Sequence, residues 1–120
     1  MKILIVDDSR AMRMIVTRTL KQAGFSGHTT AEASNGVEAL QKIEEETPDV
    51  VLCDWNMPEM NGIELLGKVR EAKHNVRFGF ITSESSAETK TLAIENGADF
   101  VLTKPFTADS MQLALEPVFA

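Results

Sequence analysis

The sequence predicts a doubly wound α/β fold, in which a five-stranded parallel sheet is covered by helices on both faces. Short apolar runs of strand length alternate five times with longer stretches whose apolar residues recur at helical spacing. The run Val50-Val51-Leu52-Cys53 is apolar on both of its faces, which is typical of a strand buried between two layers. A parallel sheet whose strands are joined by helical crossovers explains both the alternation and the buried strand. Its connections are short and right-handed.

The first strand and the first helix are expected within residues 2–24. Residues 2–7 form a short run that is rich in β-branched side chains, as in a buried strand. After Ser9 the apolar period becomes helical, and Gly24 provides a common helix end. We expect the apolar side of this helix to carry Met12, Ile15, Val16, Thr19, Leu20 and Ala23.

The second strand and helix follow in residues 28–46. Residues 28–33 are more polar than the first run, which favours an edge strand. Asn35 is a good helix cap, Glu38 follows at the capping-box spacing, and Pro48 ends the helix. We expect this helix to face the core through Val37, Leu40 and Ile43.

The second half of the chain repeats the alternation after the central strand. Strands are expected at 78–82 and 99–103, and Asn96-Gly97 is expected to end the helix between them. Three further helix starts are marked by capping side chains, namely Asn61 with Glu64, Ser85 with Glu88, and Thr107. The apolar sides of the third and last helices are formed by Leu65, Leu66 and Val69 and by Met111, Leu115 and Val118.

Length and composition describe one globular domain over residues 1–120 in a reducing compartment. A net charge of −6 disfavours direct binding to nucleic acid, because the phosphate backbone would be repelled. The single cysteine excludes an internal disulfide, and no apolar run approaches the roughly 18 residues that cross a bilayer. We therefore expect a cytoplasmic protein without membrane insertion.

Five chemically active side chains lie at or just past the ends of predicted strands: Asp7, Asp8, Asp54, Thr82 and Lys104. In an open parallel sheet the ligand site lies at the carboxyl ends of the strands. Each residue alone has an ordinary structural explanation as a turn, cap, strand or solvated residue. Three converging carboxylates would repel one another, and Mg²⁺ with its preference for hard oxygen ligands would relieve the repulsion, helped by the Asn56 carbonyl.

Lys104 and Thr82 provide the groups that a transferring phosphoryl group needs opposite the acidic cluster. An ammonium and a hydroxyl can neutralise or hydrogen-bond its oxygens. Carboxylates form acyl phosphates when a metal and a cation screen the incoming anion, so Asp54 is the candidate nucleophile. The residues themselves thus predict metal-assisted phosphoryl transfer onto Asp54.

Six segments, spread in order over the chain, make the sequence resemble the receiver domains of two-component response regulators, most closely those of the single-domain chemotaxis type. They are Val6-Asp7-Asp8, Met12-Arg13-Met14-Ile15-Val16, Asp54-Trp55-Asn56-Met57-Pro58 with Gly62, Thr82 with Glu84, Gly97-Ala98, and Lys104-Pro105-Phe106. The resemblance implies the flavodoxin-like strand order 2-1-3-4-5, for which the chemotaxis receiver is a standard example.

The resemblance also implies a role for each site residue. Asp54 would be phosphorylated by a sensor histidine kinase, and Mg²⁺ would be held by Asp7, Asp8, Asp54 and the Asn56 carbonyl. Lys104 would contact the phosphoryl group, Thr82 would respond to it, and the Lys104–Pro105 bond would be cis. Asn56 and Glu84 occupy the positions where the family tunes the lifetime of the phosphoryl group. Self-phosphorylation and self-dephosphorylation would be its only catalytic steps.

One position departs from the family pattern. Many members carry a Tyr or Phe that swings between inward and outward states three residues before the lysine, and this chain has Val101. Phe100 cannot replace that aromatic residue, because adjacent strand residues point to opposite faces. We expect the signal to be read from the loop between Thr82 and Glu84 and from the surface of the fourth helix and fifth strand.

Three alternatives remain open from the sequence. A phosphatase of the haloacid-dehalogenase type needs an aspartate two residues after its nucleophile, where this chain has Asn56. A flavodoxin-like cofactor carrier needs a phosphate loop after the first strand, where Asp7-Asp8 would repel phosphate. The chain can also be a receiver excised from a longer regulator with a DNA-binding or enzymatic effector. The downstream target and the oligomeric state are not specified by the residues.

Overall fold

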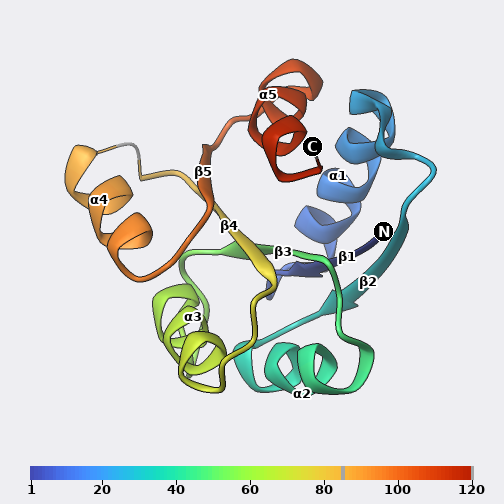
Figure 1. Cartoon of the computed structure of the whole chain (residues 1–120). Helices are drawn as coiled ribbons and strands as arrows, with labels where there is room; N and C mark the ends of the chain where they lie inside the picture. The colour runs from blue at the N-terminus through green and yellow to red at the C-terminus, as the bar shows by residue number, and fades with distance from the viewer. Residues whose placement is uncertain (85, 120) are drawn as a thin grey trace.

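A single parallel sheet forms the centre of the computed structural model, which describes residues 1–84 and 86–119 (Figure 1). Its strands are β1 (Lys2–Val6), β2 (Thr29–Ala33), β3 (Val50–Asp54), β4 (Arg77–Thr82) and β5 (Phe100–Thr103). They are ordered β2-β1-β3-β4-β5, and every neighbouring pair is parallel. The order implied by the family resemblance is therefore confirmed, as is the edge position of β2.

Helices cover both faces of the sheet, as the doubly wound prediction requires (Figure 1). On one face lie α1 (Arg10–Leu20), its π-helical continuation η1 (Lys21–Phe25) and α5 (Ala108–Phe119). On the other lie α2 (Gly36–Glu46), α3 (Gly62–Glu71) and α4 (Ala87–Glu95). The β3 residues Val50 and Leu52 face the first layer and Val51 and Cys53 the second, so β3 is buried on both sides.

The helix starts follow the capping signals closely. Ser9, Asn35 and Asn61 each accept a hydrogen bond from the third residue of the helix that they precede. Asn61 and Glu64 complete a reciprocal capping box. The expected cap Ser85 lies outside the described residues, and the observed cap of α4 is Ser86, which accepts from the Thr89 N–H at 3.2 Å.

The expectation that Val37 faces the core is wrong, since its side chain is 59% exposed. Helix α2 instead packs through Gly36, Ala39 and Ile43. Leu40 and Ile43 pack on the core as expected, and with Gly36 and Ala39 they form one i, i+3, i+4, i+7 stripe that does not include Val37. A Cβ atom on Gly36 would lie 2.7 Å from the Met60 sulfur, so the β3–α3 loop rests directly on the first turn of this stripe.

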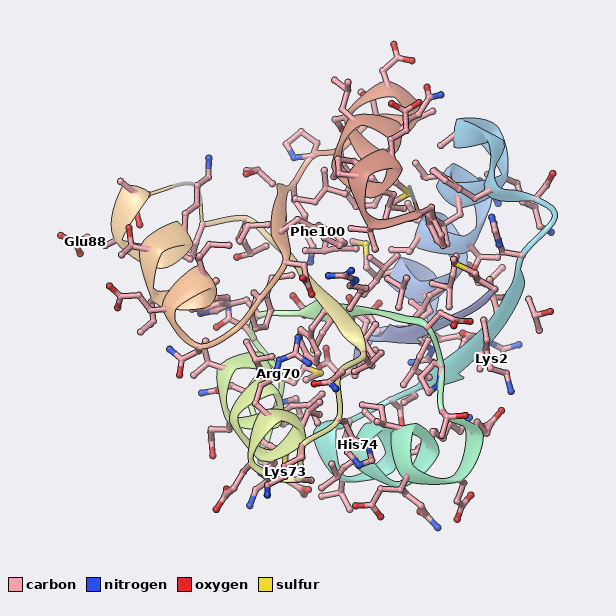
Figure 2. All side chains as sticks on the ribbon, in the orientation of Figure 1. Lys2, Arg70, Lys73, His74, Glu88 and Phe100 are labelled. Carbon is pink, nitrogen blue, oxygen red and sulfur yellow. The ribbon has the colours of Figure 1, made fainter. Side chains whose placement is uncertain are left out.

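Phe100 and Val101 point to opposite sides of β5, as expected from strand geometry. Phe100 belongs to the face covered by α1 and α5 (Figure 2), and Val101 packs on the other face. The Phe100 ring lies over Gly79 of the neighbouring strand, where a Cβ would come within 2.0 Å of the ring. Phe100 is therefore held in a slot of the sheet and takes no part in the face that carries Val101.

Arg70 ties the end of α3 to the α4–β5 loop, and Figure 2 shows it beside the turn that contains His74. Its Nη1 donates to the carbonyl oxygens of His74 and Val76, both at 2.8 Å. Its Nη2 donates to the Gly97 carbonyl at 2.9 Å and lies 3.5 Å from Asp99. One guanidinium thus joins three segments at the end of the sheet opposite the strand carboxyl ends.

Across residues 1–84 and 86–119, none of the helices combines the length and the apolar character that crossing a bilayer would require.

Candidate functional site

The carboxyl ends of four adjacent strands bring the predicted site residues together. Asp54 is the last residue of β3 and Thr82 the last of β4, while Asp7 follows β1 and Lys104 follows β5. Because the four strands are parallel neighbours in the order β1-β3-β4-β5, these residues share one edge of the sheet. Strand topology alone therefore accounts for the convergence of residues that are up to 97 positions apart.

Three carboxylates form a cluster at this edge. Asp7, Asp8 and Asp54 each offer an oxygen, and these oxygens lie within 4.8 Å of one another. Asp7 is buried, Asp54 is half-buried and Asp8 is exposed, so the cluster is open on one side. An open set of two or three carboxylate oxygens fits Mg²⁺, which keeps several waters and shares its shell with phosphate oxygens. The contribution of the Asn56 carbonyl stays a prediction.

Burial and mutual repulsion make the cluster costly without a cation. Burial, with the charges of Asp54 and Asp8, raises the pKa of Asp7 to about 6, although the Ser9 N–H partly offsets the rise. Burial also raises the pKa of Asp54, against the opposing effect of Lys104. A bound divalent cation would compensate both carboxylates, so the electrostatics of these residues also fit a metal site.

Lys104, which follows β5, lies within reach of the Asp54 carboxylate. Its Nζ lies 3.4 Å from Asp54 Oδ1, and both side chains are largely shielded from solvent. The Lys104 backbone N–H donates to the Thr82 carbonyl at 2.7 Å, which fixes the start of the β5–α5 turn. The Lys104–Pro105 peptide bond is cis, as the family resemblance implied.

The Thr82 hydroxyl is buried and already holds the loop that follows it. Its Oγ1 accepts a hydrogen bond from the Glu84 N–H at 3.0 Å. The side chain of Glu84 is exposed, as is that of Asn56, whose backbone N–H donates to the Asp54 carboxylate. Asn56 and Glu84 thus have side chains exposed to solvent, and each lies two residues after a member of the site.

Trp55 lies directly after Asp54 and packs edge-on against Phe80, with 4.8 Å between the ring centroids. The indole is partly exposed. The turn after it is tight: a Cβ on Gly62 would lie 2.5 Å from the Asp54 carbonyl oxygen and 2.6 Å from the Phe80 ring. Gly62 therefore allows α3 to begin against the end of β3.

Comparisons with known proteins agree with this geometry. The family model of the response regulator receiver domain matches residues 3–116. The chain belongs to the response regulator receiver family. The chemotaxis protein CheY-3 of Vibrio cholerae is 41% identical to this receiver over 99% of this chain and 92% of its own length. For the chemotaxis protein CheY1 of Helicobacter pylori the identity is 38%, with 98% of this chain and 96% of that protein covered.

A solved structure supports the same assignment. The structure of chemotaxis protein CheY4 of Vibrio cholerae aligns with the receiver at a TM-score of 0.86 and 35% identity, covering 98% of this chain and 97% of that chain. CheY-like receivers are regulators rather than classical enzymes. Family membership therefore decides against the dehalogenase-type phosphatase and the flavodoxin-like cofactor carrier.

The sequence analysis gave no role to one residue of the receiver that contacts the site, Arg13. Its Nη1 donates to the backbone carbonyl of Asp7 at 2.6 Å, and its Nε pairs with Glu32 Oε1 at 2.8 Å. The available signal was its helical position, three and seven residues before the buried Val16 and Leu20. A charged residue on the apolar side of a helix indicates a specific buried partner.

Proposed function

We propose that residues 1–120 form a chemotaxis-type receiver that accepts a phosphoryl group on Asp54 from the phosphohistidine of a sensor histidine kinase. The placement of the Asp54 carboxylate carries the proposal, because it lies close both to two other carboxylates and to the Lys104 ammonium. Receivers of this type act by binding other proteins, and the acidic surface of this one disfavours direct contact with DNA.

The transfer is a displacement at phosphorus. An oxygen of the ionised Asp54 carboxylate attacks the phosphorus atom, the bond between phosphorus and the imidazole nitrogen breaks, and the nitrogen leaves with that electron pair. Lys104 offsets part of the rise that burial causes in the pKa of Asp54, and it attracts the incoming anionic oxygens. When bound between Asp7, Asp8, Asp54 and the Asn56 carbonyl, Mg²⁺ supplies further neutralisation of phosphoryl charge.

Hydrolysis of the acyl phosphate needs a water molecule at the open side of the site. Asn56 and Glu84 have exposed side chains and lie two residues after Asp54 and Thr82 respectively. Their size and charge decide how easily water approaches the phosphorus atom, which supports their assignment as the residues that set the lifetime of the phosphoryl group.

The Thr82 hydroxyl links the site to the surface. If it turns toward a phosphoryl oxygen, the Glu84 N–H loses its partner and the loop that leads into α4 rearranges. Helix α4 exposes Leu92 and Ile94, which suit recognition by a partner. This route needs no aromatic swing, consistent with the aliphatic side chain of Val101. Backbone amide NMR shifts on adding a phosphoryl mimic should extend into α4, and shifts confined to residues around Asp54 would contradict it.

Intact-mass analysis after incubation with acetyl phosphate and Mg²⁺ tests the assignment of the acceptor. The wild type should gain the mass of one phosphoryl group, and neutral hydroxylamine, which cleaves acyl phosphates, should remove it. Asp54→Asn should gain nothing, while the control Asp109→Asn, at an exposed position in α5, should behave as the wild type. An adduct that persists in Asp54→Asn or resists hydroxylamine would overturn the proposal.

A further inference from the structure

We infer that Arg13 is a positioning residue for the magnesium site, acting through the peptide group that joins Asp7 to Asp8. This inference rests on the proposed function, because it concerns how the metal-binding carboxylates are held. Arg13 lies in α1 and does not reach toward Asp54; its contact is with the main chain of Asp7. The effect therefore passes through backbone geometry.

The contacts of Arg13 form a bridge between the site and the edge of the sheet. Nη1 donates to the Asp7 carbonyl at 2.6 Å, and Nε donates to Glu32 Oε1 on β2 at 2.8 Å. Only 14% of the Arg13 side chain is exposed, so water competes weakly for the bond to Asp7, whereas Glu32 is 51% exposed and its bond is more open to water. The guanidinium plane fixes the angle between the two bonds, which an ammonium cannot do.

The Asp7–Asp8 turn is held at three points, of which Arg13 provides one. The Asp7 N–H donates to the Ala33 carbonyl at 3.1 Å, and the Ser9 N–H donates to Asp7 Oδ1 at 2.8 Å. The bond from Arg13 to the Asp7 carbonyl then sets the tilt of the peptide plane that leads to Asp8. Because Asp8 is exposed, packing does little to fix its side chain, and this tilt determines whether its carboxylate points toward the cluster.

The sign of the effect separates positioning from simple charge. A positive charge beside a magnesium site repels the cation, so Arg13 acting only by its charge would weaken magnesium binding, and its removal would tighten it. A guanidinium that orients the metal-binding carboxylates strengthens magnesium binding, and its removal weakens that binding. Loss of a residue that orients metal ligands typically costs about 10-fold to 100-fold in affinity. The two explanations thus predict opposite changes.

Calorimetric titration with Mg²⁺ of the wild type, Arg13→Met, Arg13→Lys and Arg18→Met tests the inference. We expect Arg13→Met to weaken Mg²⁺ binding by about 10-fold or more. Arg13→Lys keeps the charge but lacks the planar guanidinium with its several donors, so it should weaken binding by a smaller factor. Arg18→Met is the matched control, because Arg18 is an exposed arginine of the same helix. At saturating Mg²⁺ the rate of acetyl phosphate labelling in Arg13→Met should recover toward that of the wild type.

Each outcome has a defined meaning. If Arg13→Met binds Mg²⁺ as tightly as the wild type or more tightly, the positioning role is refuted while the proposed function stands. If the wild type itself binds no Mg²⁺, the proposed function fails together with the inference. Should Arg13→Met not fold, Arg13→Lys and Glu32→Ala decide the question, since Glu32→Ala removes the acceptor that holds Nε. Unchanged affinity in both would then refute the role.

Discussion

Replacement of Asp7 by Asn should stabilise the metal-free protein at neutral pH, because burial and the nearby Asp54 and Asp8 charges raise the pKa of Asp7 to about 6. The rise from 3.8 corresponds at most to about 3 kcal/mol, and water at the open side of the site reduces the expected gain to about 1 to 2 kcal/mol. Asn keeps the oxygen that accepts the Ser9 N–H, so the local turn is retained.

The pH dependence of this gain follows from proton linkage. Below about pH 3 Asp7 is protonated in both the folded and the unfolded wild type, so its raised pKa costs nothing. Between about pH 4 and pH 6 the unfolded state loses the proton first, and the free energy of unfolding of the wild type falls as the pH rises. The advantage of Asp7→Asn should therefore open over this range and stay constant above it.

Urea unfolding followed by far-UV circular dichroism, with a chelator present and at intervals from about pH 4 to 8, measures the effect across the titration range of Asp7. Asp8→Asn is the matched control and should gain much less, because the Asp8 side chain is exposed. If Asp7→Asn is no more stable than the wild type near neutral pH, or if its advantage is the same at both ends of the range, burial does not dominate the energetics of Asp7.

Three other predictions concern the metal and the fold. Magnesium affinity measured by calorimetry should fall as the pH drops below about 6, because protonated Asp7 cannot bind a cation well, and a constant affinity down to pH 5 would contradict the raised pKa. Gly79→Ala should lower the free energy of unfolding by about 2 kcal/mol through its clash with the Phe100 ring, and Phe100→Leu in the same chain should recover part of the loss. Asn61→Ala should cost about 1 kcal/mol by removing the capping box of α3, and an unchanged denaturation midpoint would show that the cap contributes nothing.

Local signals in the sequence predicted most of the fold, because strand-length apolar runs and capping residues act over a few positions. Ser9, Asn35 and Asn61 cap the helices that they were expected to begin. The run that starts at Val50, which is apolar on both faces, forms a central strand. The convergence of Asp54 and Lys104 also followed, since parallel topology places strand ends along one edge.

Features that depend on contacts between distant segments were beyond the reach of periodicity. Met60, 24 residues after Gly36, rests on the first turn of α2, and no local pattern indicates that contact. The contacts of Arg13 join Asp7 and Glu32, residues brought near α1 only by the pairing of β1 with β2. The partners of Arg13 therefore depend on the three-dimensional arrangement and not on any local pattern in the sequence.

The tie made by Arg70 has a consequence for sequence variation at the far end of the sheet. All of its hydrogen-bond acceptors at His74, Val76 and Gly97 are main-chain carbonyls, which every amino acid carries. Substitutions at His74 and Val76 can therefore accumulate while the junction keeps its shape, provided that the backbone path is preserved. Arg70 has no such freedom, because no other side chain offers as many donors in one plane. The shape of the junction therefore depends on the Arg70 side chain and on the backbone path of its partners, and little on the side chains of His74 and Val76.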